Sequence, residues 1–128
     1  MKLLLLACAG GAVGSGARYL VGVGVLRIVG VTSGFPWATL CVNVVGSFLM
    51  GFFIEMLALK LSGSQELRTF FATGVLGGFT TFSAFSLDFA TLLSRKQEFA
   101  AGSYLVSSVA LSFLALFAGL ALARQVYS

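Results

Sequence analysis

The sequence predicts an all-α integral membrane protein that folds as a single domain of residues 1–128. The first observation is composition: 59% of the residues are hydrophobic and only 9% are charged, whereas soluble domains carry roughly 25% charged residues. The second is the presence of four apolar segments, each long enough to cross a bilayer, which takes about 20 helical residues. The third is that the connections are short, so consecutive helices are expected to pack as antiparallel neighbours in a bundle.

The four predicted transmembrane helices lie at about residues 3–29, 36–59, 67–93 and 99–126. The first is rich in glycine and contains Arg18, and the second follows the turn-like sequence GVTSGFPW at residues 30–37, which holds the only proline. The third contains the sequence GGFTTFSAF at residues 77–85. Small residues spaced by four, typical of closely packed membrane helices, recur at Gly10 and Gly14, at Gly74 and Gly78, and at Ala115, Gly119 and Ala123.

The sequence GGFTTFSAF predicts that the third helix is interrupted. Its two adjacent glycines have poor helix propensity, and the hydroxyls of Thr80, Thr81 and Ser83 compete for backbone hydrogen bonds. Interrupted backbone within a membrane is tolerated only where it is buried in protein or lines a polar cavity. The carbonyl oxygens freed there are hard ligands that suit an alkali cation. The alternative is a simple kink, in which the hydroxyls bond back to the preceding turn.

Three of the predicted helices each carry a polar or aromatic stripe on one face. The stripes are Thr39, Asn43 and Ser47 in the second, Phe79, Phe82, Phe85 and Phe89 in the third, and Tyr104, Ser108 and Ser112 in the fourth. Such hydroxyls can serve only to join helices, but a buried amide such as Asn43 needs partners for two donors and an acceptor. A phenyl ring is positive at its edge and can meet an anion there. Together the stripes describe a narrow, donor-lined path for a small anion.

Lysine and arginine are almost equally divided between the two predicted sides of the membrane. One side carries Lys2, Lys60, Arg68 and Arg124, and the other carries Arg27, Arg95 and Lys96. Since an excess of positive charge normally sets the orientation, this near balance predicts that the chain inserts in both orientations, unless other details favour one. Dual insertion would permit an antiparallel homodimer.

The charged residues also exclude several classes of function. The basic residues are scattered, with only Arg95 and Lys96 adjacent, which argues against a nucleic-acid partner and for contact with lipid head groups. The sequence has no histidine and only 4 acidic residues, which argues against a transition-metal site and against an enzyme with a general acid and base. Arg18 is a functional candidate or snorkels to the interface, whereas Glu55 and Asp88, near the ends of predicted helices, are interpreted as interfacial.

Over essentially its whole length the chain resembles the bacterial Fluc, or CrcB, family of fluoride channels. The resemblance rests on GGAVGSGARY at residues 10–19, on GFPWATLCVNVVGSFLMG at 34–51, which contains a Thr-x-x-x-Asn-x-x-Gly pattern, and on GVLGGFTTFSAFSLD at 74–88. The last sequence is similar to the family signature of Gly-Gly, Thr-Thr-Phe-Ser and a second Phe. One position departs from it, because Ala84 stands where the family commonly has Thr.

The resemblance implies an antiparallel, dual-topology homodimer in the bacterial inner membrane. Two separate pathways would let fluoride leave the cell passively and so confer fluoride resistance. Carried onto this sequence, Phe82 and Phe85 would line the pathways with their ring edges, and Asn43 would hydrogen-bond the fluoride or orient those rings. A polar track along the pathway would consist of Ser108, Ser112, Tyr104 and Thr39.

The resemblance also implies a structural Na⁺ at the dimer interface. The backbone carbonyls of Gly77 and Thr80 from both subunits would hold this ion. Arg18 would lie toward a vestibule and attract anions.

Two other function classes fit a small four-helix membrane protein. A small multidrug-resistance-type transporter is expected to need a carboxylate in its first helix, and this chain has Arg18 there instead, which repels cationic drugs. A non-transporting assembly subunit would use the polar stripes only to join helices. From the residues alone the inference reaches a small anion and a bound cation, and the resemblance supplies fluoride.

Overall fold

The computed structural model describes residues 1–30 and 34–128. Over these ranges the elements are all helices: α1 (Lys2–Val29), α2 (Trp37–Lys60), α3 (Gln65–Leu67), the π-helix η2 (Arg68–Leu76), α4 (Gly77–Phe79), α5 (Phe82–Ser94) and α6 (Glu98–Tyr127). Four helical stretches are long and apolar enough to cross a membrane, the third being Gln65–Ser94. The prediction of an all-helical chain with four such helices is confirmed. Residues 31–33 of the predicted turn at 30–37 lie outside the described residues.

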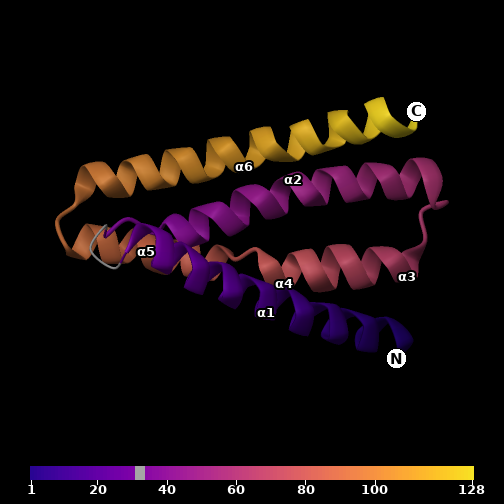
Figure 1. Ribbon diagram of the computed structural model, residues 1–128, viewed down its shortest axis with the longest axis horizontal. Coiled ribbons are helices and arrows are strands. Elements are labelled where there is room, and N and C mark those ends of the chain that lie inside the picture. The colour runs from indigo at the N-terminus through magenta and orange to yellow at the C-terminus, as the bar shows by residue number, and fades with distance from the viewer. Residues whose placement is uncertain (31–33) are drawn as a thin grey trace.

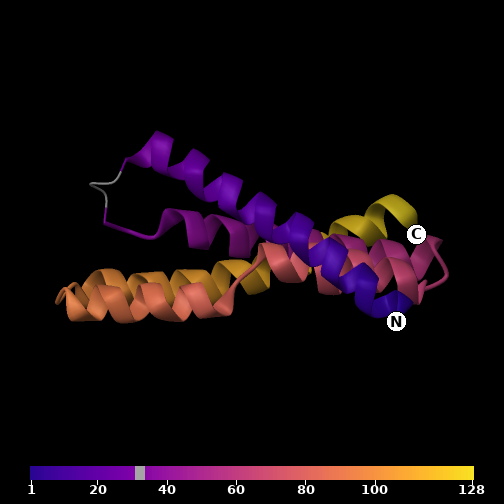
Figure 2. The same ribbon diagram turned by 90° about the horizontal axis from the view of Figure 1, so that it is seen from below.

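The helices form an elongated bundle in which α6 runs along α2 and α1 crosses the third stretch (Figure 1). Both termini and the α2–α3 connection lie at one end of the bundle. The end of α1, the start of α2 and the α5–α6 connection lie at the other end, where α1 and the start of α2 diverge from α5 and α6 (Figure 2). Consecutive helical stretches therefore alternate in direction, as the sequence predicts.

Glycines let the helix backbones touch at two crossings. Between α2 and α6, a Cβ atom added to Gly51 would collide with the Leu116 carbonyl oxygen, and one added to Gly119 would lie 2.7 Å from the Phe52 nitrogen. Between α1 and α4, a Cβ atom on Gly78 would lie 2.7 Å from the Gly11 carbonyl oxygen. Close backbone approach through small residues drives much of the helix association in lipid, where helices gain little from the hydrophobic effect.

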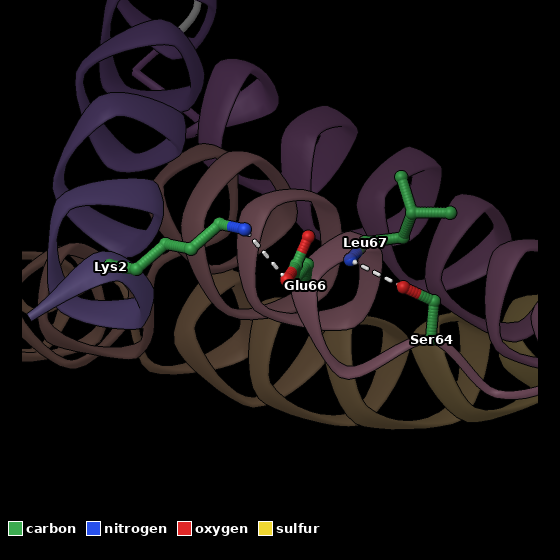
Figure 3. A network of polar contacts seen from close by, with 4 residues as sticks. All are labelled: Lys2, Ser64, Glu66 and Leu67. Atoms are coloured by element: carbon green, nitrogen blue, oxygen red, sulfur yellow. Dashed lines mark hydrogen bonds and ion pairs between the residues drawn. The ribbon is translucent and has the colours of Figure 1, made fainter.

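Two ion pairs join the helices toward the end that carries the termini. Lys2 Nζ lies 2.8 Å from Glu66 Oε1 and so connects α1 to α3 (Figure 3). The Leu67 N–H donates to Ser64 Oγ at 3.3 Å, which caps the start of α3. Arg124 Nε lies 2.8 Å from Glu55 Oε1 and connects α6 to α2. Each ion pair therefore joins the same two helical stretches as one of the glycine contacts.

Candidate ion-binding site

The backbone leaves helical geometry at two residues in the middle of the third stretch. α4 ends at Phe79, Thr80 (φ −82°, ψ 159°) and Thr81 (φ −154°, ψ 122°) are extended, and α5 begins at Phe82. Thr80 Oγ1 donates to the Leu76 carbonyl at 2.9 Å, and Thr81 Oγ1 accepts the Ala84 N–H at 3.1 Å and caps α5. The two hydroxyls thus hydrogen-bond to backbone groups of the helices before and after the two extended residues. We call these two residues the Thr80–Thr81 break.

Asn43 of α2 binds the backbone of this break through both ends of its amide. Its Nδ2 donates to the Thr81 carbonyl at 3.0 Å, and its Oδ1 accepts the Thr81 N–H at 2.8 Å. In a continuous helix that N–H would donate to Gly77, four residues back. The amide therefore replaces a helical hydrogen bond, frees the Gly77 carbonyl, and keeps one Nδ2–H available for another acceptor.

A cavity of about 290 Å³ lies beside the break, between α2, α5 and α6. It brings together most of the residues predicted for the anion path: Asn43, Ser47, Phe82, Phe85, Ser108 and Ser112. The Phe82 ring is 77% exposed, whereas Phe85 is buried, and the two rings meet edge to face with their centroids 5.5 Å apart. Within residues 1–30 and 34–128, the buried hydroxyl oxygen of Ser108 has no hydrogen-bond partner.

Tyr104 and Thr39, which the sequence also predicts for the path, do not line this cavity. Tyr104 is fully buried, at 0% exposure, and packs edge to face on Phe85 with their centroids 5.1 Å apart. Its hydroxyl donates to Asp88 Oδ2 at 3.1 Å. Thr39 and Asp88 instead line a second cavity of about 480 Å³, between the diverging helix ends visible in Figure 2. Tyr104 therefore contacts residues of both cavities.

One expectation drawn from the sequence is wrong. Phe79 does not share one helix face with Phe82, because Phe79 belongs to α4 and Phe82 to α5, with extended backbone between them. The interpretation of Asp88 as interfacial stays a prediction, and the hydrogen bond that its carboxylate accepts from the fully buried Tyr104 was not predicted.

Arg18 reaches the break from α1. Its Nη1 donates to the Thr80 carbonyl oxygen at 3.2 Å, so the guanidinium contacts one of the two carbonyls predicted to hold a cation. The described residues include no cluster of three or more His, Cys, Asp or Glu side chains that could hold a metal ion.

Comparison with known proteins identifies the family. Residues 5–120 match the family model described as CrcB-like protein, Camphor Resistance (CrcB). This chain belongs to the CrcB family. A family member named "Fluoride-specific ion channel FluC" from Rhizobium meliloti (strain 1021) is 56% identical over 126 residues, covering 98% of this chain and 99% of the relative. Relatives with the same name from Chelativorans sp. (54%; 98% and 99% covered) and Mesorhizobium japonicum (53%; 96% and 97% covered) are similarly related.

Membership of the CrcB family indicates the membrane in which the four apolar helices lie. The similar family members come from bacteria, and each of the four helical stretches of this chain is long enough to cross a bilayer. The chain is a multi-pass protein of the bacterial inner membrane.

Proposed function

We propose that this chain is a fluoride-selective channel that lets fluoride leave the bacterial cell passively, and that it catalyses no chemical reaction. Its relatives bear the name of fluoride-specific ion channels. The observation that carries the proposal is the buried Ser108 hydroxyl, which has no partner among the described residues and lines a cavity together with Phe82 and Phe85. A buried donor without a partner costs roughly 1–3 kcal/mol, and an anion in the cavity would remove that cost.

The break supports this function because it presents opposite partial charges on its two sides. α5 starts at Phe82, beside the cavity, and the start of a helix is partially positive and carries N–H groups without helical partners. The freed carbonyls before the break are partially negative. Interrupted membrane helices use these ends to bind anions and cations, respectively.

Selectivity for fluoride would follow from the narrow, mostly apolar walls of this path. The ring edges of Phe82 and Phe85 are weakly positive, and the spare Nδ2–H of Asn43 and the Ser108 hydroxyl are among the stronger donors of the cavity. Groups held in place by helices replace the water shell of an ion of the right size better than that of a larger one. Chloride would lose its hydration and regain fewer contacts.

The functional unit we propose is an antiparallel, dual-topology homodimer, in which the interrupted third helix of each copy faces the other. The cavity is open on one side, and the Phe82 ring, which would face the anion, is 77% exposed. A second copy would cover this ring and close the path. The near balance of positive charge across the membrane supports insertion in both orientations.

The proposed structural Na⁺ fits the oxygens at the break, and its site would comprise Gly77 and Thr80 of both copies. Carbonyl oxygens suit hard cations, and the N–H groups that would bind these two in a continuous helix go elsewhere: that of Thr81 to Asn43 and that of Ala84 to Thr81 Oγ1. Na⁺ would supply a positive charge that attracts both carbonyl pairs and so joins the copies. Arg18, proposed at a vestibule, already contacts Thr80.

Ion efflux from liposomes containing the purified protein tests the proposal. Fluoride- and chloride-selective electrodes in parallel are expected to record fast loss of fluoride and retention of chloride. If neither ion leaves liposomes that contain folded, dimeric protein in Na⁺, the polar stripes serve only to join helices, and the assembly-subunit alternative replaces the channel. Efflux of both ions would contradict the selectivity.

A further inference from the structure

The contact between Arg18 and Thr80 results from how α1 packs. Gly10, Gly14 and Arg18 are spaced by four and share one face of α1. Gly14 lies so close to the third stretch that an added Cβ atom would be 2.9 Å from the Phe79 nitrogen. One turn further along, Arg18 therefore meets the residues directly after Phe79 and donates to the Thr80 carbonyl at 3.2 Å.

Arg18 also takes the place of a missing backbone donor. In a continuous helix the Ala84 N–H would donate to the Thr80 carbonyl, four residues back. Here that N–H donates to Thr81 Oγ1 instead. A carbonyl without a partner is costly inside a membrane, and hydrogen bonds from a charged donor are stronger than neutral ones. The guanidinium thus satisfies the Thr80 carbonyl within a single copy of the chain.

We propose that Arg18 is a built-in cation that competes with Na⁺ for the Thr80 carbonyl. This inference rests on the Na⁺ site of the proposed function. A guanidinium and a Na⁺ on the same oxygen repel each other strongly where little water screens them. Na⁺ therefore binds tightly only when Arg18 releases Thr80, and by linkage each cation weakens the binding of the other. Arg18 sets how much Na⁺ the assembled protein needs.

The Na⁺ dependence of thermal unfolding tests this competition without relying on channel activity. A bound ion raises the unfolding temperature by mass action. Purified protein is titrated with Na⁺ against N-methyl-D-glucamine at constant ionic strength and constant protein concentration. The variants are Arg18→Gln, which keeps a hydrogen-bond donor without the charge, and Arg27→Gln, which removes an exposed arginine from the same helix.

Arg18→Gln is expected to lower, by about fivefold or more, the Na⁺ concentration that gives a fixed rise in unfolding temperature above the Na⁺-free protein; fivefold is the lower range of coupling between two sites. Arg27→Gln is expected to need the same Na⁺ concentration as the wild type. If Arg18→Gln needs as much Na⁺ as the wild type or more, the competition is overturned. If Arg18→Gln does not fold, Arg18→Lys takes its place, with a smaller decrease expected, because lysine keeps the charge and loses the planar fork; an unchanged Na⁺ requirement would again overturn the competition.

The same preparation separates this inference from the channel function. If unfolding of the wild type and of Arg18→Gln is independent of Na⁺, the Na⁺ site and the competition are both overturned. Fluoride efflux from liposomes containing the wild type is then measured independently. Selective efflux in that case would retain the channel and remove only the cation.

Discussion

Two pairs of helices in this bundle touch through glycines, but the backbone beside the contact is continuous in one pair and interrupted in the other. α2 and α6 touch through Gly51 and Gly119, and each is continuous. α1 and the third stretch also touch through glycines, including Gly78, but two residues after Gly78 the backbone becomes extended at Thr80. Glycine at a helix contact is therefore not sufficient to interrupt a membrane helix.

The difference lies in side chains that provide alternative partners for the backbone. At the break, Asn43 binds both backbone groups of Thr81, and Arg18 binds the Thr80 carbonyl. Gly119 is followed by Leu120 and Ala121, which offer no polar group to the backbone. In lipid, only a helix whose freed groups find partners elsewhere is interrupted.

The largest expected effect on stability and efflux comes from removing the Asn43 amide, which binds the backbone of the break. Asn43→Ala leaves the Thr81 N–H and carbonyl without the amide, at roughly 1–3 kcal/mol for each unsatisfied group. We expect a lower unfolding temperature, and fluoride efflux reduced by about tenfold for each 1.4 kcal/mol lost at the path. Thermal unfolding and liposome efflux measure the two effects.

Cys41→Ala is the control for Asn43→Ala, since Cys41 is exposed on the same helix two residues away. It is expected to leave both measurements unchanged. Wild-type stability together with wild-type efflux in Asn43→Ala would show that the amide neither supports the break nor serves the path.

A smaller effect on the unfolding temperature is expected at the contact between the continuous helices α2 and α6, where two glycines of α6 give a matched comparison. Gly119→Ala would force apart α6 and α2, because its Cβ atom would lie 2.7 Å from the Phe52 nitrogen, and overpacking costs roughly 1–3 kcal/mol. Gly102→Ala meets nothing within 4 Å and is expected to be neutral or to stabilise by roughly 0.5–1 kcal/mol through helix propensity. Equal unfolding temperatures for the two variants would contradict the contact.

The number of apolar helices, several of their close contacts and most of the residues that line the cavity beside the break were predictable, because they depend on local pattern. Hydrophobic length indicates a helix that can cross a membrane, and a spacing of four places Gly10 with Gly14, and Ser108 with Ser112, on one face. The hydroxyl and glycine content of GGFTTFSAF likewise indicated where helical geometry is weak.

The partners of Arg18 and Asp88 could not be read from the sequence. Arg18 and Thr80 are 62 positions apart, and their contact depends on how far α1 approaches the third stretch at Gly14. The bond between Tyr104 and Asp88 depends in the same way on how α5 meets α6. Periodicity assigns a residue to a face, whereas a partner on another helix is fixed only by tertiary packing.

Replacing Ser108 is expected to have a moderate effect on fluoride efflux without lowering stability. Ser108→Ala removes an oxygen that has no hydrogen-bond partner among the described residues, so its unfolding temperature is expected to stay the same or rise. Fluoride efflux is expected to fall by about tenfold, the equivalent of one hydrogen bond of roughly 1.4 kcal/mol. In the control Ser107→Ala, the lost hydroxyl donates to the Ser103 carbonyl of its own helix and has no other partner among the described residues, so efflux should be retained. Unchanged efflux in Ser108→Ala would remove this residue from the path.

The smallest effects are expected at the two ion pairs, one for each side of the comparison. Glu66→Gln releases Lys2 and loosens α1 from α3, at about 0–1 kcal/mol for an exposed pair. Glu55→Gln releases Arg124 and loosens α6 from α2, and its effect should be the larger of the two, because the Glu55 side chain is only 18% exposed against 56% for Glu66. Unfolding at low and high salt measures both, and salt should erase the Glu66 effect first, since exposed charges are screened most. If Glu66→Gln lowers the unfolding temperature more than Glu55→Gln does, the ion pair between α1 and α3 contributes more to stability than the ion pair between α2 and α6.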